Sequence, residues 1–254
     1  MLIAITRDVS PAIGQCELTY LDRVEIDYAL ACTQHEHYRQ ALAGLGCRVV
    51  SLPAQADLPD SVFVEDVALV LDEAAILTRP GAASRRSEVE LMAPILAQYR
   101  PLARIEPPST LDGGDILRLG KTIYVGLSGR SSAEAIRQLR ELTAPFGYAV
   151  TAVPVTGCLH LKSAVTQVAP DTLLVNPGWI NTFDFSRWRV LKVDPAEPGA
   201  ANALLVGTGL IYPACFPRTA RRLAQHGLAP TLVDVGELQK AEGAVTCCSL
   251  VFAG

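Results

Sequence analysis

The chain of 254 residues has no long hydrophobic run and no excess of basic residues. No stretch approaches the roughly 20 apolar residues that a membrane span needs, and the N-terminal apolar run is too short for a signal peptide. The 22 lysines and arginines are outnumbered by 26 acidic residues, which gives a net charge of −4. Binding to a phosphate backbone requires a basic surface. We therefore expect neither nucleic acid nor a membrane as a partner.

Cysteine is present, but it lacks the spacing of a disulfide framework or a structural zinc site. The seven cysteines are an odd number, lie scattered along the chain and form no CxxC pair. This pattern is typical of reduced thiols, so we expect a cytoplasmic protein without a metal site. Half of the residues are hydrophobic and 19% are charged, which predicts a folded core and excludes global disorder.

The chain also contains a repeated order of elements. Units of the form strand–strand–helix–strand start near residues 62, 112, 160, 202 and 245. Spacings of roughly 42–50 residues are typical of repeat architectures. The expected strands are 2–6, 47–52, 62–71, 74–79, 102–106, 114–119, 122–127, 148–153, 161–169, 172–176, 189–193, 203–206, 209–212, 231–235 and 244–252, and the expected helices are 25–45, 85–99, 132–146 and 217–226.

The two chain ends can complete one unit between them. The fifth unit lacks its helix and its last strand, whereas the N-terminus supplies a strand, a helix and a strand before residue 53. Joining the two would close a ring with no open sheet edge. We therefore predict one α/β domain over residues 1–254, with five blades, strands inside and helices outside. An ordinary mixed α/β sheet is the alternative.

Unusual polar residues lie at the start of each unit. If the units are related by rotation, Asp112, His160, Asn202 and Cys247 face one central cleft. A thiolate nucleophile, an imidazole that moves protons and a carboxylate that orients the imidazole form a catalytic set. Each residue also has a simpler explanation, since Asp-Gly-Gly-Asp is typical of a turn and free cysteines are often buried packing residues.

Three further carboxylates lie in the apolar run that starts the first unit. Strand alternation would place Glu65 and Asp66 on opposite faces. Carboxylates in such a run are costly unless they meet a cation, and a planar guanidinium fits paired carboxylates by charge and by geometry. The cation could belong to a substrate, or Asp60, Glu65 and Asp66 could pair internally with Arg79, Arg85 or Arg86.

With these motifs in order, the sequence resembles the dimethylarginine dimethylaminohydrolase family of guanidine-modifying enzymes. The resemblance spans nearly the whole chain and implies a five-bladed pseudosymmetric α/β propeller, in agreement with the repeat count. The motifs that carry it are Leu-Pro-Asp-Ser-Val-Phe-Val-Glu-Asp (58–66), Thr-Arg-Pro-Gly-Ala-Ala-Ser-Arg-Arg (78–86), Leu-Asp-Gly-Gly-Asp (111–115), Leu-His-Leu-Lys (159–162), Ala-Asn (201–202) and Thr-Cys-Cys-Ser-Leu (246–250).

The resemblance also implies roles for individual residues. Cys247 would be the nucleophile, His160 the proton donor to the leaving amine, and Asp112 the residue that orients His160. Ile13 would lie on a loop over the cleft and, like Ala241, contribute backbone groups. The residues implied to bind substrate or order the site are Ile13, Asp60, Phe63, Glu65, Asp66, Arg85, Arg130, Ala241 and Glu242.

The activity implied is hydrolysis of Nω-methylated L-arginines to L-citrulline and dimethylamine or methylamine, through a thiouronium intermediate on the cysteine. It requires a small-molecule substrate and neither a metal nor an organic cofactor. An arginine deiminase-like hydrolase is the nearest alternative, although deiminases usually carry an inserted helical domain that this chain lacks. A non-catalytic binding protein of the same fold is the other. A homodimer is one possible assembly.

Overall fold

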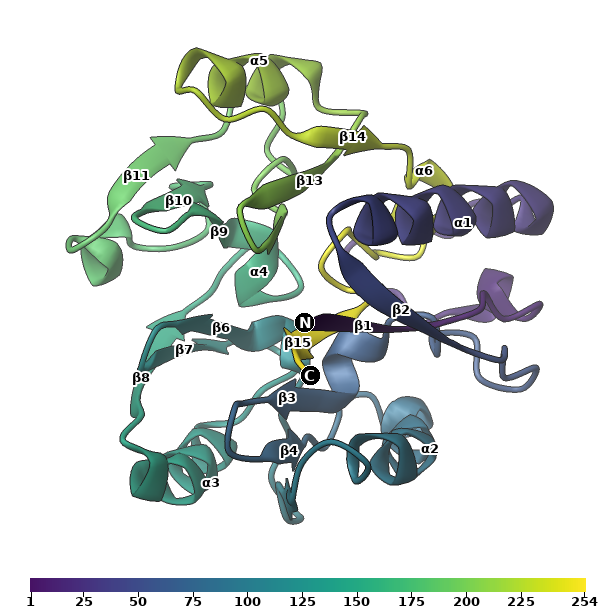
Figure 1. Ribbon diagram of the computed structural model, residues 1–254, viewed down its shortest axis with the longest axis vertical. Coiled ribbons are helices and arrows are strands. Elements are labelled where there is room, and N and C mark those ends of the chain that lie inside the picture. The colour runs from purple at the N-terminus through teal and green to yellow at the C-terminus, as the bar shows by residue number, and fades with distance from the viewer.

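A computed structural model describes all 254 residues, which form five small sheets around a central axis (Figure 1). Each sheet has three strands. In every sheet the middle strand pairs antiparallel with one neighbour and parallel with the other. This repeated topology confirms the predicted ring of five related units.

The blades follow one another in chain order, and helices lie on the outside of the ring (Figure 1). In the third blade a short 3-10 helix, Thr182–Phe185, stands in place of the outer helix. The first blade consists of β3 (Ala68–Val70), β4 (Ala75–Leu77), α2 (Arg86–Leu96) and β5 (Leu102–Arg104), and the second of β6 (Ile116–Leu119), β7 (Thr122–Leu127), α3 (Ala133–Thr143) and β8 (Ala149–Pro154). The third consists of β9 (Val165–Ala169), β10 (Thr172–Val175) and β11 (Arg189–Lys192), and the fourth of β12 (Leu204–Val206), β13 (Gly209–Pro213), α5 (Pro217–Gln225) and β14 (Thr231–Val233). The fifth consists of β15 (Leu250–Ala253), β1 (Leu2–Arg7), α1 (Tyr28–Gly44) and β2 (Cys47–Leu52).

The two chain ends complete the fifth blade. Strand β15 pairs antiparallel with β1, from Leu2 opposite Ala253 to Ile5 opposite Leu250. The N–H of Gly254 also donates to the carbonyl of Met1 at 2.8 Å. Both termini lie near the centre of the ring (Figure 1). The pairing closes the ring as predicted, so β1 has a partner on each side.

The core is divided into five clusters, and each lies between neighbouring blades. One cluster, for example, joins Ile3 and Ile5 of the fifth blade to Val67 and Met92 of the first. Another joins Ile76 of the first blade to Ile123 of the second. Every blade therefore buries apolar surface against both neighbours. No helix has the length and apolar character that a membrane crossing requires.

Several expected strands begin later than predicted, because a helical turn precedes them. The strand expected at 62–71 is confined to β3, and a 3-10 turn, η2 (Val64–Val67), comes before it. The turns η4 (Gly113–Asp115) and α4 (Leu161–Ala164) precede β6 and β9. These turns bond to other blades, as when the Glu65 N–H donates to the Cys247 carbonyl. Local periodicity cannot reveal partners so distant in sequence.

Candidate active site

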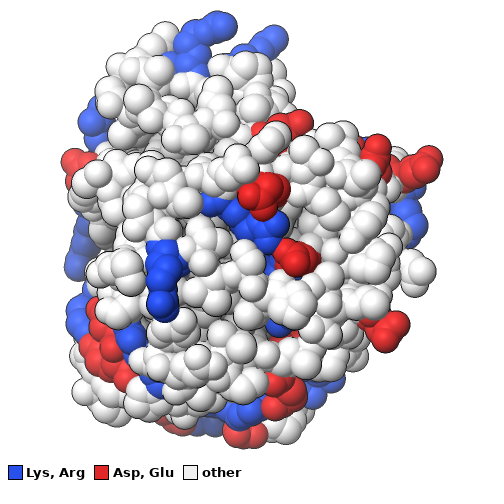
Figure 2. Space-filling view, turned by 45° about the vertical axis from the view of Figure 1, so that its right-hand side comes forward, with Lys and Arg blue, Asp and Glu red and all other residues white.

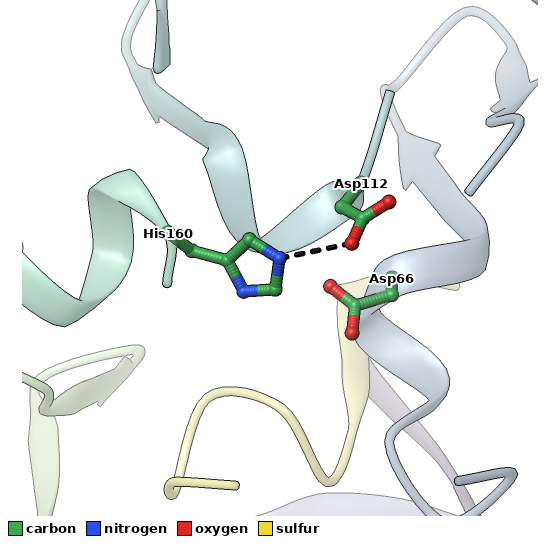
Figure 3. A group of neighbouring side chains, drawn as sticks. All are labelled: Asp66, Asp112 and His160. Carbon is green, nitrogen blue, oxygen red and sulfur yellow. Dashed lines mark hydrogen bonds and ion pairs between the residues drawn. The ribbon is translucent and has the colours of Figure 1, made fainter. Parts of the chain in front are cut away.

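His160 and Asp112 form a buried ion pair at the centre of the ring. The imidazole Nε2 and Asp112 Oδ2 lie 3.0 Å apart. Figure 3 shows the Asp66 carboxylate facing the same imidazole from the η2 turn. The bond to Asp112 is the one hydrogen bond that the imidazole makes within the protein. The ring also lines a cavity, where it can exchange a proton with a bound molecule.

The two glycines after Asp112 allow other groups to approach closely. A Cβ on Gly114 would lie 2.4 Å from His160 Nδ1, and one on Gly113 would lie 1.9 Å from the Glu65 carbonyl oxygen. Neither glycine has a positive φ angle. The Asp-Gly-Gly-Asp segment thus needs glycine for space beside the Glu65 carbonyl and the imidazole, not for an unusual turn conformation.

Asp115 supports His160 from behind. Its fully buried carboxylate accepts hydrogen bonds from the hydroxyls of Ser128 and Ser131. It also accepts the backbone N–H of Leu161, the residue after His160, at 2.9 Å. These bonds fix the start of α4, and with it the position of the imidazole.

Cys247 lies in a turn and not in the expected strand 244–252. Its N–H donates to the Ala244 carbonyl at 3.1 Å, and its own carbonyl accepts the Glu65 N–H at 3.1 Å. Cys247 lines the cavity that His160 and Asp112 also line. Cys248 is fully buried outside that cavity and donates to the Ala244 carbonyl. The turn, and not the alternation of a strand, places these two neighbouring thiols in different surroundings.

The charges in the site favour a protonated imidazole and a neutral thiol. Burial alone would lower the pKa of His160, but Asp66 and the bond to Asp112 outweigh it and raise that pKa to about 9. Burial would raise the pKa of Asp66, yet His160 and Arg85 lower it to about 2. Burial, Glu65 and Asp66 raise the pKa of Cys247. The thiol needs an additional nearby cation before it can ionise near neutral pH.

The cavity has a marked excess of acidic groups. Its lining includes five carboxylates but only two guanidiniums and one imidazole. Its volume is about 20 Å³, which is space for little more than one water molecule. A larger ligand therefore requires the wall to move. The lining residues are Glu17, Asp60, Phe63, Asp66, Arg85, Asp112, Arg130, Leu159, His160, Ala241, Glu242, Gly243 and Cys247.

Arg85 provides the internal cation that was one of the alternatives for the carboxylates. Its Nη1 donates to Asp66 Oδ2 at 2.6 Å, and its Nε and Nη2 donate to Glu88 at 3.1 and 2.9 Å. Nη2 also donates to the Phe63 carbonyl. Because its donors are engaged and it is buried, Arg85 orders the acidic wall and holds Asp66 in place.

Glu17, in the loop between β1 and α1, lines the cavity, and residues 17–21 bond to other lining residues. The Glu17 N–H donates to the Asp60 carboxylate at 3.1 Å. The Glu242 Oε1 accepts three consecutive N–H groups from this segment, those of residues 19, 20 and 21. Arg130 donates to the Thr19 hydroxyl at 2.9 Å. We call residues 17–21 the lid segment.

Two residues predicted for the substrate site do not line the cavity with their side chains. The Ile13 side chain is buried in the core, because the 3-10 turn that carries it directs it inward, and the predicted role of its backbone groups stays a prediction. Glu65 pairs with Lys162 and accepts the Thr246 hydroxyl, and it lines a separate cavity near the axis. Conversely, Glu17, Leu159 and Gly243 line the site without having been predicted. Leu159 and Gly243 directly adjoin the predicted residues His160 and Glu242 in the sequence, whereas Glu17 meets Asp60 only in the folded chain.

Asp66, Asp112 and His160 are the only cluster with the geometry to hold a metal ion. Their ligand atoms lie within 4.8 Å of one another. Each already has a protein partner, because Arg85 binds Asp66 and His160 binds Asp112.

On the face drawn in Figure 2, basic and acidic side chains are interspersed and meet at a hollow near the middle.

Comparisons with known proteins agree with this geometry. A sequence model described as N,N dimethylarginine dimethylhydrolase, eukaryotic, matches residues 19–192. The chain is also similar to an N(G),N(G)-dimethylarginine dimethylaminohydrolase of Streptomyces coelicolor. The two are 42% identical over 250 residues, covering 97% of this chain and 95% of that protein.

Two solved structures share the fold closely. One is a cysteine variant of the Pseudomonas aeruginosa dimethylarginine dimethylaminohydrolase complexed with citrulline, with a TM-score of 0.92, 33% identity and 98% coverage of both chains. The other is a histidine variant of a dimethylarginine dimethylaminohydrolase, as an adduct with S-methyl-L-thiocitrulline. It has a TM-score of 0.94 and 34% identity, and the match covers 99% of this chain and all of that one.

Proposed function

Because the chain belongs to the dimethylarginine dimethylaminohydrolase family, we propose that it hydrolyses Nω-methylated L-arginines. The products are L-citrulline and either dimethylamine or methylamine. Related proteins bind citrulline or form an adduct with S-methyl-L-thiocitrulline, and these molecules resemble the product and the substrate of such a reaction.

The observation that carries the proposal is one acidic cavity shared by Cys247, the His160–Asp112 pair and Asp66. A methylated arginine carries a guanidinium, an ammonium and a carboxylate, so it has a net charge of +1. The excess of carboxylates in the lining complements that charge. The guanidinium also supplies the cation that the Cys247 thiol needs in order to ionise, since a nearby positive charge favours the thiolate.

The reaction then proceeds in two covalent steps. The Cys247 thiolate attacks the guanidinium carbon, and His160 donates a proton to the departing amine as the C–N bond breaks. An S-alkylthiouronium remains on Cys247. Water attacks this carbon while His160 accepts a proton from it. Collapse of the adduct breaks the C–S bond, releases citrulline and returns the cysteine. Asp112 stabilises the imidazolium whenever His160 carries the proton.

The remaining lining residues bind the substrate or shape its cavity. Asp66 contacts the guanidinium while Arg85 holds the Asp66 carboxylate in place. Arg130 is only half-buried and receives the α-carboxylate, because a guanidinium fits a carboxylate bidentately. Asp60 accepts the α-ammonium. The walls formed by Phe63, Ala241 and Glu242 enclose the carbon chain.

The test is citrulline release from asymmetric dimethylarginine, monomethylarginine and arginine at equal concentrations. We expect both methylated substrates to have far larger kcat/KM values than arginine. Comparable values for arginine, with ammonia as the second product, would indicate the deiminase alternative. No citrulline from any of the three would indicate a non-catalytic binding protein. Cys247→Ser is the control for background hydrolysis.

The location and assembly of the enzyme are also proposals. All seven cysteines are free, which is typical of a reducing compartment, and we place the enzyme in the cytoplasm. Residues 1–254 act as a single catalytic domain. A homodimer stays a prediction, which analytical ultracentrifugation at micromolar concentrations tests.

A further inference from the structure

Four polar side chains next to Cys247 form a hydrogen-bonded chain that does not line the active-site cavity. Lys162 pairs with Glu65. The Thr246 hydroxyl donates to Glu65 Oε2 at 2.8 Å, and Asn202 Nδ2 donates to Thr246 Oγ1 at 3.0 Å. Glu65, Asn202 and Thr246 are buried, and Lys162 is largely so.

Thr246, the residue before the nucleophile, uses its hydroxyl both as a donor and as an acceptor and uses its N–H as a donor. Its hydroxyl donates once and accepts once, and its backbone N–H donates to Asn202 Oδ1 at 3.1 Å. Asn202 Nδ2 also donates to the Lys162 carbonyl at 3.1 Å. With Oδ1 and Nδ2 both engaged, the Asn202 amide has one fixed orientation, and it can hold Thr246 in only one position.

The chain links the segments that carry the reacting groups. Glu65 is adjacent to Asp66 in the η2 turn, and Lys162 follows His160 by two residues at the start of α4. Thr246 is adjacent to Cys247, whose carbonyl accepts the Glu65 N–H. These segments belong to three different blades. Their relative placement therefore depends on contacts made across the axis of the ring.

We propose that Thr246 and Asn202 are positioning residues, which act with the Glu65–Lys162 pair to hold Cys247 in register with His160 and Asp66. The inference rests on the proposed function, since it concerns the same thiol chemistry. Reacting groups must be aligned closely, and a misplacement of about 1 Å can lower a rate by about 100-fold. None of these four side chains needs to touch the substrate to have this effect.

The test compares Thr246→Val with Thr246→Ser. Valine keeps the shape of threonine but removes the hydroxyl, whereas serine keeps the hydroxyl. We expect Thr246→Val to lower kcat by about 10- to 100-fold with little change in KM, and Thr246→Ser to stay near the wild-type rate. Alkylation of Cys247 by chloroacetamidine, measured without substrate, should likewise be slow in Thr246→Val and near the wild-type rate in Thr246→Ser.

Thr143→Val is the matched control. The Thr143 hydroxyl is also buried and donates to the Leu139 carbonyl, but it lies at the end of α3 on the outside of the second blade. This change should lower Tm and leave both kcat and the alkylation rate unchanged. A loss of rate that merely reflects lower stability would appear in this control as well.

The proposal is overturned if Thr246→Val and Thr246→Ser have equal kcat and equal alkylation rates. If Thr246→Val does not fold, Asn202→Ala takes its place, and wild-type rates in that variant overturn the proposal. Failure of the proposed function gives a different result: the wild-type protein then releases no citrulline from methylarginines. The alkylation rates of the valine and serine variants still decide the positioning role.

Discussion

At the residue scale, the reactivity of Cys247 depends on a cation that the resting site does not provide. His160 is charged, with its pKa raised to about 9 mainly by Asp66 against the effect of burial. The neighbouring carboxylates nevertheless raise the pKa of Cys247 together with burial. Cys247, the proposed nucleophile, is therefore a neutral thiol until a positively charged molecule enters.

This charge state predicts how Cys247 responds to two alkylating reagents. With neutral iodoacetamide, the labelling rate should keep rising above pH 9, because the raised thiol pKa leaves little thiolate at neutral pH. Cationic chloroacetamidine should show the same rise shifted to lower pH, because its charge stabilises the thiolate. The rates are measured by mass spectrometry of the peptide containing residue 247.

Cys248→Ser is the control for these profiles, since Cys248 is fully buried outside the cavity. It should retain activity and both pH profiles, whereas Cys247→Ser should lose turnover and rapid labelling. Identical profiles for the two reagents would contradict the requirement for a cation. Labelling that disappears in Cys248→Ser would show that the nucleophile has been assigned to the wrong thiol.

Replacing Asp112 tests the orientation and charge of His160. Asparagine can still bond to the imidazole, but it cannot stabilise an imidazolium and it favours a different tautomer. We expect Asp112→Asn to lower kcat by about 10²- to 10⁴-fold. Citrulline binding, measured by calorimetry, should change little. A kcat near the wild-type value would reduce Asp112 to a structural residue that binds the Gly81 N–H.

The same pair contributes to stability in a defined pH range. The folded pKa of His160 is raised to about 9, above the ordinary value near 6.5. Its contribution is therefore fully present below about pH 6.5 and is lost as the pH rises through about 9. In Asp112→Asn, part of this alkaline loss of stability should disappear, which denaturant titrations between these pH values can measure.

At the element scale, the lid segment is held closed mainly by one carboxylate. The Glu242 Oε1 accepts N–H groups from Thr19, Tyr20 and Leu21, and Glu242 is the only residue other than glycine with a positive φ angle, 57°. The left-handed backbone directs the carboxylate toward the lid. A cavity of about 20 Å³ is too small for an amino acid, so we expect the lid segment to move during entry.

We predict that Glu242→Ala frees the lid segment. Amide hydrogen exchange at residues 19–21 should become faster, and KM should rise because the lid no longer closes over the substrate. Glu197→Ala is the matched control, because Glu197 also accepts two backbone N–H groups, from Arg218 and Thr219 at the start of α5. Unchanged exchange in Glu242→Ala would show that other contacts hold the lid.

Elements also show what the sequence could and could not predict. The order of strands and helices followed from hydrophobic periodicity, because each blade buries one face in a regular way. The turns η2, η4 and α4 were mistaken for strand, since their backbone groups bond to other blades. The proposed catalytic residues Asp112, His160 and Cys247 line one cavity, because they recur at equivalent positions of the units. Glu65 lies in the turn η2 and lines a different cavity, because a residue in a turn does not follow the alternation of a strand.

At the scale of the whole molecule, the ring has no independent parts. Each of the five hydrophobic clusters contains residues from neighbouring blades. The residues of the site come from different blades, so the site exists only when the ring is closed. Unfolding one blade would expose apolar surface on both of its neighbours. We therefore expect the chain to unfold in a single cooperative transition.

Phe252 allows this expectation to be tested far from the point of change. Phe252 is buried in β15, which closes the ring, and its ring packs edge-on against Tyr99. Phe252→Ala should lower the free energy of unfolding by about 3–5 kcal/mol, which lowers Tm by roughly 6–20 °C.

The only two tryptophans, Trp179 and Trp188, lie in the third blade. In a cooperative ring, their fluorescence should report the same fall in Tm as far-UV circular dichroism does. Val251→Ala, on the half-buried neighbouring position of β15, should cause a smaller fall. If circular dichroism shifts while tryptophan fluorescence keeps its wild-type midpoint, the blades unfold separately and the closed ring is not one cooperative unit.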